Sequence, residues 1–325
     1  MKYAAAIFLM IFALPAPALA ASFDCEKAST PREKTTCATP ELSKADEQIA
    51  ANYEAAMSRL SPEGAARLRD GQRSWLAFLS EACPKGGAEC LAPFMTDRVE
   101  FLSGAVSVEG GNTFLAWDDW RFIAPAREGD EELPGANDMR YRQQLHYAID
   151  APDMDGERAF NAAIAKEEEY LWNGFDGEKR MWASFTLNMA TPALVSLDMF
   201  QWQFPLGAAH GFGAAAHLNF RLDEARPLRA DDIFAREGWE AALTEAVLKE
   251  LRADAAEDGV IYFDGYEQTV AETAAKPENW VLTGESLGVN FSVYSIGPYV
   301  IGDRTPAVPW AALSSFIAED APVGR

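Results

Sequence analysis

Four cysteines are the residues of this sequence whose type and spacing point most directly to a chemistry. Eleven residues separate Cys25 from Cys37, and six separate Cys83 from Cys90. Neither spacing is the close Cys-x2-Cys of a zinc site, and cysteines of an exported chain usually form disulfides. Four cysteines allow three connectivities. We favour the two local pairs, 25–37 and 83–90, because each lies across a short turn between predicted helical segments.

Two histidines, His210 and His217, lie close together in the segment GAAHGFGAAAH. Small residues on both sides of His210 allow a tight turn. We interpret His210 as a histidine that hydrogen-bonds this turn, and a loop that presents its imidazole to a partner is the alternative. The two histidines have no matching acid or thiol in the pattern, so we predict no metal site.

Two further motifs match functional signatures but lack their context. GESLG at 284–288 fits Gly-x-Ser-x-Gly, yet a strand pattern follows Ser286 and no histidine lies beyond His217, so we predict a hairpin turn. DAPDMDGE at 150–157 contains a fragment of a calcium loop without the later ligands, so we predict a solvated acidic turn. We therefore predict no catalytic residues and no cofactor; an enzyme with dispersed site residues is the alternative.

The first twenty residues have the pattern of a signal peptide. Lys2 precedes an apolar run, and Ala18-Leu19-Ala20 provides a small-x-small cleavage site. We expect cleavage near Ala20/Ala21 and a periplasmic or secreted protein. No cysteine stands directly after the cleavage site, and no other apolar stretch is long enough for a bilayer, so we expect no membrane anchor.

The formal net charge of −22 restricts the partners of the chain. Such a charge repels nucleic acid and anionic lipid, and it attracts basic proteins at long range. Solubility is the simpler interpretation of the charge, and a basic protein partner is the more specific one.

The segments that contain the cysteines predict a small helical domain over residues 21–105. Thr30-Pro31-Arg32-Glu33 combines a cap, a first-turn proline and a capping box, and Thr39-Pro40 and Ser61-Pro62 begin two more helices. CPKGGAEC then turns the chain, and LAPFMTDRVEFL predicts a last short helix. We expect a Gly-rich linker at 106–112.

Residues 113–325 alternate between strand and helix patterns. ASFTLNM, ALVSLDMFQWQF and AAHLNFRL predict strands, and the segments 156–172 and WEAALTEAVLKEL predict helices. LGVNFSVYSI predicts another strand, with Leu287, Val289, Phe291 and Val293 inward. The predicted fold class is α+β: a small, disulfide-stapled helical domain followed by a larger domain with a mainly antiparallel sheet.

Residues 22–103 resemble the LprI-like N-terminal domain, a family named after a mycobacterial lysozyme inhibitor. The resemblance rests on the four cysteines in order, the C-x-K-A-x-T-P-x-E-K-x-x-C opening, the Pro-Glu-Leu-Ser helix start and the Q-x-x-W-L segment. It implies a domain that binds lysozyme. The lipid-anchor cysteine of that family is missing here.

Residues from about 200 to 320 resemble the RsiV-like C-terminal domain, which occurs in an anti-sigma factor whose outer part binds lysozyme. PLGAAHGFGAAAHLNFRLDEARPLRADDIF and NFSVYSIGPYVIGDRTPAVPWAALSSF carry the resemblance. Ala208 stands where a second glycine is usual, and a sigma-binding segment is missing. The anti-sigma role is therefore not carried over.

Both resemblances imply the same partner class, so we expect a non-enzymatic protein that binds or inhibits a lysozyme or a related peptidoglycan-lytic enzyme. A peptidoglycan-associated module or envelope hydrolase and an envelope ligand-sensing domain are the alternatives. Two constrained loops are candidates for contacting the partner; their residues are Pro84, Lys85, Gly86 and Gly87 in the first, and Gly207, His210, Gly211 and Phe212 in the second.

Overall fold

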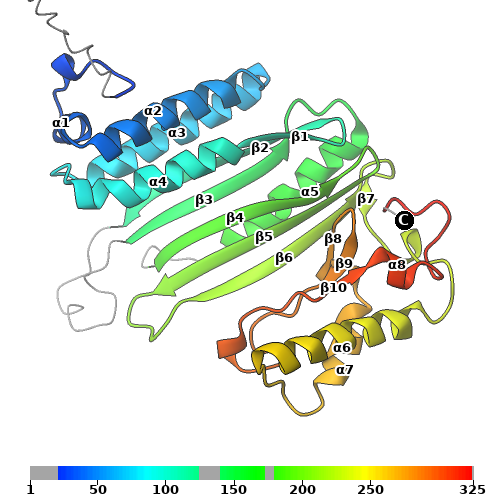
Figure 1. Ribbon diagram of the computed structural model, residues 1–325. Helices are drawn as coiled ribbons and strands as arrows, with labels where there is room; N and C mark the ends of the chain where they lie inside the picture. The colour runs from blue at the N-terminus through cyan, green and yellow to red at the C-terminus, as the bar shows by residue number, and fades with distance from the viewer. Residues whose placement is uncertain (1–20, 124–139, 173–178, 324–325) are drawn as a thin grey trace, which may run out of the picture.

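The computed structural model describes residues 21–123, 140–172 and 179–323. The expected signal peptide, residues 1–20, lies outside these ranges. Four helices, α1–α4, lie along one edge of a long twisted sheet, and a smaller C-terminal part packs at the opposite edge (Figure 1). The helical elements described are η1 (Cys25–Lys27), α1 (Pro31–Ala38), α2 (Pro40–Met57), α3 (Pro62–Ala82), α4 (Ala88–Gly104), α5 (Asp155–Trp172), η2 (Ala230–Asp232), α6 (Trp239–Asp258), α7 (Tyr266–Ala274), η3 (Pro277–Asn279), η4 (Tyr299–Ile301) and α8 (Trp310–Leu313).

The main sheet has seven strands in sequence order, and a second sheet has three in the order β10-β9-β8. Neighbouring strands are antiparallel except β3 and β4, which are parallel and connected through α5. This arrangement confirms the predicted α+β class with a mainly antiparallel sheet. The strands are β1 (Val106–Glu109), β2 (Asn112–Ile123), β3 (Arg140–Ile149), β4 (Lys179–Ala190), β5 (Leu194–Pro205), β6 (Phe212–Arg221), β7 (Arg226–Pro227), β8 (Trp280–Leu282), β9 (Ser286–Val289) and β10 (Ala307–Pro309).

Local signals set the helix starts as predicted. The Thr30 hydroxyl accepts a hydrogen bond from the Glu33 backbone N–H, and the Glu33 carboxylate accepts from the Thr30 N–H at 2.9 Å, which completes the capping box of α1. The Ser61 hydroxyl caps α3 by accepting from the Gly64 N–H at 3.1 Å. In the part of the chain that the structure describes, no helix has both the length and the apolar character needed to cross a membrane.

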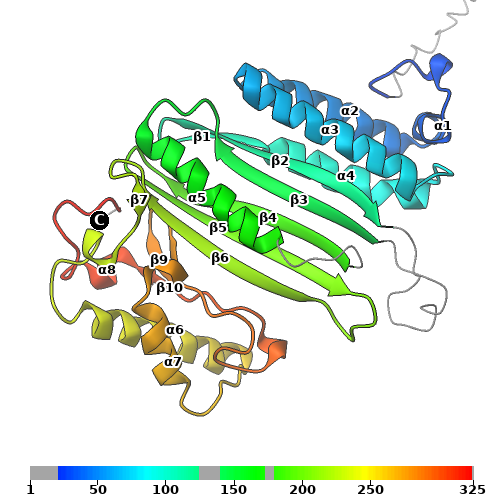
Figure 2. The ribbon, with the colours of Figure 1, turned by 180° about the vertical axis from the view of Figure 1, so that it is seen from behind.

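Separate apolar clusters hold the sheet and the C-terminal part. Helix α5 lies against the back of the sheet, where Phe160 and Ile164 pack with strand residues such as Leu197 and Phe220 (Figure 2). The C-terminal part has its own core, in which α6 packs against the three-stranded sheet. Members of this core include Leu243, Val247, Leu251, Trp280, Leu282, Leu287 and Val289.

Two expected segments differ from the structure. The predicted strand LGVNFSVYSI ends at Val289, because β9 pairs with β8 and β10 over only a few residues and the chain then turns through Tyr294 at φ +66°. Val293, expected to point inward, is only half-buried. The segment 106–112, expected as a linker, contains β1 and the turn at Gly110-Gly111 that joins it to β2.

A buried ion pair connects α4 to the main sheet. Arg98 of α4 and Asp118 of β2 are 1% and 0% exposed, and Arg98 Nη1 donates to both Asp118 oxygens at 2.8 and 2.9 Å. Asp118 also accepts from Trp120 Nε1 at 2.6 Å and Gln143 Nε2 at 3.1 Å, and Arg98 Nε donates to Gln72 at 2.9 Å. The helices and the sheet therefore share one polar network.

We predict that Arg98→Met lowers the free energy of unfolding by about 3–5 kcal/mol, because it leaves the Asp118 carboxylate buried without its counter-charge. Urea unfolding measures this loss. Arg73→Met is the matched control, since the Arg73–Asp70 pair is more than 70% exposed and should contribute less than about 1 kcal/mol. Equal small losses in the two variants would show that the ion pair does not hold the two parts together.

Glu33 predicts an acid-dependent component of stability. The backbone N–H groups of Thr30 and Ser29 donate to its carboxylate and lower its pKa from 4.5 to about 2. A lowered folded-state pKa contributes stability that is present above pH 4.5 and is lost as the pH falls toward 2. Urea midpoints at pH 5 and pH 3 should therefore differ more in the wild type than in Glu33→Gln; an identical pH dependence would contradict the cap.

Candidate functional site

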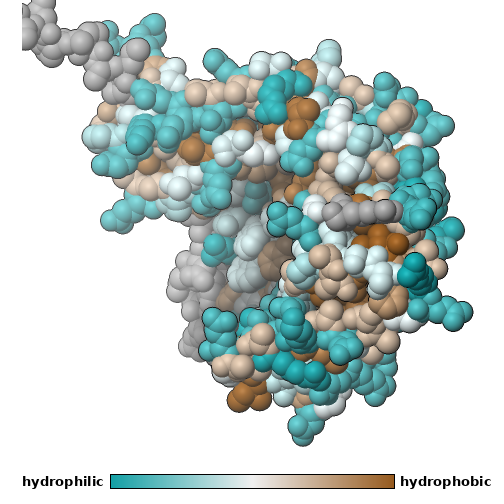
Figure 3. Space-filling view, turned by 45° about the vertical axis from the view of Figure 1, so that its right-hand side comes forward, coloured by the Kyte–Doolittle hydropathy of each residue, from teal (hydrophilic) through white to brown (hydrophobic). Residues whose placement is uncertain are grey.

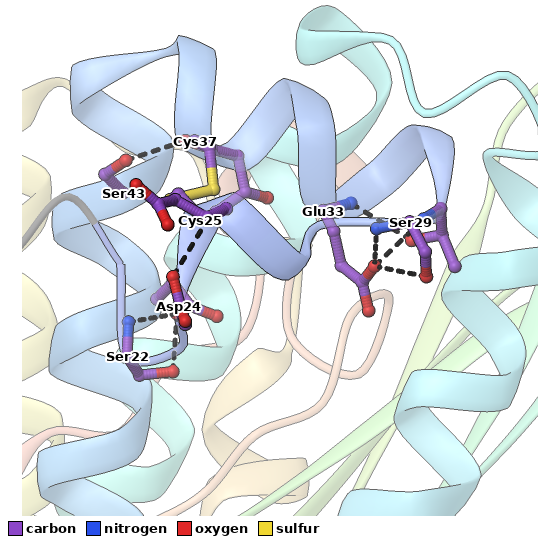
Figure 4. The surroundings of a disulfide bond; sticks show 11 residues. Ser22, Asp24, Cys25, Ser29, Glu33, Cys37 and Ser43 are labelled. Carbon is purple, nitrogen blue, oxygen red and sulfur yellow. Dashed lines mark hydrogen bonds between the residues drawn. A yellow bond between two sulfur atoms is a disulfide. The ribbon is translucent and has the colours of Figure 1, made fainter.

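The four cysteines form the two local disulfides that we favoured, Cys25–Cys37 and Cys83–Cys90. The first clips the N-terminal segment to the end of α1, and the Ser43 hydroxyl donates to the Thr36 carbonyl beside it at 2.7 Å (Figure 4). Ser22 donates to Asp46 of α2 from both its backbone N–H and its hydroxyl. The disulfide and these hydrogen bonds hold the start of the described chain against α2.

The first candidate loop is a short turn closed by the Cys83–Cys90 disulfide. Pro84, Lys85 and Gly87 are exposed, whereas Gly86 is buried. Gly86 has φ +61°, and a Cβ at this position would lie 2.6 Å from the backbone nitrogen of Arg32. The turn thus rests tightly on the first turn of α1 and presents only three residues to a partner.

The second candidate loop joins β5 to β6. The Nδ1–H of His210 donates to the Gly211 carbonyl at 2.9 Å, as expected for a histidine that hydrogen-bonds its turn. The same carbonyl accepts from the Tyr299 hydroxyl at 3.1 Å. Gly207, His210 and Phe212 are exposed and Gly211 is buried. The loop is therefore fixed by a residue 88 positions further along the chain.

His217 lies apart from this turn and has a different partner. The strand register places it opposite Asp198, whose Oδ1 lies 2.6 Å from His217 Nδ1. His217 Nε2 is buried and has no hydrogen-bond partner among the described residues. Sequence reasoning missed this pair because only the pairing of β5 with β6 brings the two side chains together. Residues 21–123, 140–172 and 179–323 contain no cluster of His, Cys, Asp and Glu that could hold a metal ion.

The two signature-like motifs have structural roles. GESLG forms the turn between β8 and β9, where Ser286 hydrogen-bonds Thr283, so the predicted hairpin is confirmed. The acidic segment 150–157 is less solvated than predicted. Asp150 accepts from the Ser61 N–H and hydroxyl at 2.6 and 2.7 Å, and the buried Glu157 accepts from two N–H groups ahead of α5.

An exposed apolar surface, here named the aromatic patch, gathers around the second loop. It contains six of the nine exposed large hydrophobic residues in the described part of the chain. Tyr299 joins its segments: its ring lies 4.8 Å from His210 and 5.6 Å from Tyr294. The Phe263 N–H donates to the Ile296 carbonyl at 2.9 Å, which adds a third segment. The members of the patch are Phe212, Ile261, Phe263, Tyr294, Tyr299 and Val300.

A cavity of about 410 Å³ lies between α4 and strands β2–β4. Figure 3 shows the molecule hollowed between the helices above and the C-terminal part below. The pKa of the Asp97 carboxyl is raised, because burial and the neighbouring Glu100 outweigh the opposing effect of Arg180. The residues that line the cavity are Asp97, Arg98, Glu100, Phe101, Asp118, Trp120, Tyr141, Gln143, Arg180, Trp182 and Ser184. Sequence reasoning did not find this site, because its residues come from four elements with no common motif.

Comparison with family models assigns the two parts separately. Residues 25–102 match the family described as lysozyme inhibitor LprI, which confirms the resemblance of the helical part. Residues 231–311 match a protein family of unknown function, DUF3298, within the stretch where an RsiV-like domain was expected. The RsiV-like name itself is not confirmed. What the comparison supports for these residues is the DUF3298 match.

Two solved structures of DUF3298 family proteins are similar to this chain. The protein from Bacteroides fragilis is 18% identical, with a TM-score of 0.45, and the match covers 66% of this chain and 96% of the other. The protein from Pseudomonas aeruginosa is 13% identical, with a TM-score of 0.46, and the match covers 67% and 100%. Comparison of the sequence with curated proteins finds no match.

We predict that Gly211→Ala destabilises the β5–β6 turn, because its Cβ would clash with the Trp202 ring and lie 2.9 Å from the Gln203 carbonyl oxygen. Such overpacking should lower the free energy of unfolding by about 1–3 kcal/mol. Gly284→Ala is the control, since its Cβ would have no neighbour within 4 Å, and it should change stability by less than about 0.5 kcal/mol. Urea unfolding measures the stability of both variants. Equal losses of stability would mean that Trp202 does not constrain the turn.

Proposed function

We propose that the protein is an exported, non-enzymatic binding protein for a basic peptidoglycan-lytic enzyme of the lysozyme class, which it binds or inhibits. The observation that carries the proposal is the match of residues 25–102 to a lysozyme-inhibitor family. The two disulfides support an oxidising compartment such as the periplasm or the outside of the cell. A cleaved signal peptide at residues 1–20 is part of the same proposal.

The charge of the chain supports a basic partner. A net charge of −22 steers cationic proteins toward the molecule and makes their association sensitive to salt. Steering raises the association rate more than the affinity, so a stable complex also needs an apolar surface that is desolvated on binding.

The aromatic patch is the surface that best meets this need. Large exposed apolar patches on soluble proteins mark interaction sites, and aromatic side chains are enriched at interfaces. Val300 is 88% exposed and Ile261 is 73% exposed, so neither contributes much to the core. Exposed carboxylates of Asp264, Glu267 and Asp303 follow closely in the same segments. We therefore place the partner's basic surface over the patch and this acidic surround.

The second candidate loop belongs to this surface, because Tyr299 connects it to the patch. The first candidate loop lies in the helical part, within the range of the lysozyme-inhibitor match. Contact through Pro84, Lys85 and Gly87 is the second element of the proposal.

Calorimetry of the oxidised chain, residues 21–325, against a c-type lysozyme at low and moderate salt tests the proposal, with lytic activity measured in parallel. We expect binding that weakens with salt, and loss of lysis if the bound protein covers the lysozyme cleft. Absence of binding at both salt concentrations would overturn the proposal for this class of lytic enzyme.

We predict that Ile261→Ser combined with Val300→Ser weakens lysozyme binding by at least about tenfold, or 1.4 kcal/mol, because it removes the two most exposed apolar side chains of the patch. The matched control is Val108→Ser with Met154→Ser, which also alters two exposed apolar residues, 55% and 48% exposed, outside the patch. The control should bind like the wild type. Equal affinities for all three proteins would exclude the patch as the docking surface.

A further inference from the structure

We propose that the cavity between α4 and strands β2–β4 is a binding site for a sugar that carries a carboxylate. The site is independent of the aromatic patch, because none of the residues that line the cavity belongs to the patch. Its volume of about 410 Å³ falls within the range of about 300–1,000 Å³ that is usual for small-molecule sites.

Two arginines supply unused hydrogen-bond donors at the cavity wall. Arg98 is 99% buried, and its Nη2 has no hydrogen-bond partner among the described residues although Nη1 and Nε are paired. Arg180 Nε is also buried without a partner in this part of the chain. A buried N–H without a partner is destabilising, so an acceptor that enters the cavity and pairs with it is stabilised.

The acceptor that fits is a carboxylate. Asp118 already neutralises Arg98, whereas Arg180 forms no ion pair within 4 Å among the described residues and interacts with Asp97 only at longer range. The Arg180 guanidinium is held over the Tyr141 ring at 5.2 Å and lies 5.9 Å from the Trp202 ring. A guanidinium fixed by aromatic rings keeps its planar fork of donors in place for a bidentate carboxylate.

The remaining walls fit the ring of a sugar. Trp182 lines the cavity, and the electron-rich face of such a ring attracts the polarised C–H groups on one side of a pyranose. The rings of Trp120 and Tyr141, which stack on each other, close the neighbouring wall. Asp97 and Glu100 also line the cavity, and their carboxylates are able to accept hydrogen bonds. A hydroxyl group both donates and accepts, so a polyhydroxylated ring can donate to these carboxylates while its carboxylate accepts from Arg180.

The test uses glucuronic acid as the probe and glucose as its control, because the two differ only in a carboxylate that replaces a CH2OH group. Each is titrated into the oxidised chain, with calorimetry and tryptophan fluorescence as readouts, since Trp120 and Trp182 line the cavity. We expect glucuronic acid to bind at least tenfold more tightly than glucose. Equal affinities, or no binding of either sugar up to about 10 mM, would overturn the proposal.

Arg180→Gln should weaken glucuronic acid binding at least tenfold and leave glucose binding unchanged. Arg67→Gln is the matched control: Arg67 also stacks on a tryptophan, Trp117 at 4.9 Å, but it lies outside the cavity. Unchanged affinity in Arg180→Gln would overturn the role of the guanidinium. If Arg180→Gln does not fold, Ser184→Leu, which fills the cavity, should abolish binding, and persistence of binding in that variant would contradict the site.

A negative result for lysozyme binding and a negative result for sugar binding are distinguishable, because the two proposals use different surfaces. Ile261→Ser with Val300→Ser should leave glucuronic acid binding unchanged, because both residues lie outside the cavity. Loss of sugar binding in this variant would contradict the independence of the two sites.

Discussion

The buried ion pair between Arg98 and Asp118 is the constraint on which the arrangement of the N-terminal helices against the main sheet depends. A charged pair removed from water is stable only when its hydrogen bonds are nearly all satisfied, and Gln72, Trp120 and Gln143 provide most of them here. Because these groups come from α3, α4, β2 and β3, they can meet only when the helices lie on the sheet in one position. The cavity beside the pair is a consequence of that position.

The C-terminal part presents a different kind of surface. The loop between β5 and β6 is held by Tyr299, and Tyr294 adopts a left-handed backbone conformation that is unusual for an aromatic residue. Strained or unusual backbone of this kind persists where the surrounding structure fixes it, and it often occurs at binding sites. A fixed, exposed aromatic surface loses little conformational entropy on binding, which suits a docking surface for a protein.

Features that depend on neighbours in sequence were predictable, and features that depend on register were not. The capping box of α1, the two disulfides and the turn at Ser286 follow from local residue types. By contrast, Asp150 was expected in a solvated turn, yet it binds Ser61, 89 positions away. The His217–Asp198 pair follows from the alignment of β5 with β6, and β9 ended earlier than its alternation suggested because its partners are short. The cavity and the aromatic patch each combine several segments without a common motif.

Hydrogen exchange of the oxidised chain, alone and with saturating c-type lysozyme, tests the central claim most directly: a basic lytic enzyme docks on the aromatic patch, which the β5–β6 loop and the C-terminal part form together. The account predicts slower exchange in the three segments 206–212, 259–265 and 294–301, and in residues 85–87 of the first candidate loop where that loop also contacts the partner, with exchange in α4 and β2 unchanged. Protection confined to other segments, or no protection anywhere under conditions in which lysozyme is present in excess, would contradict it.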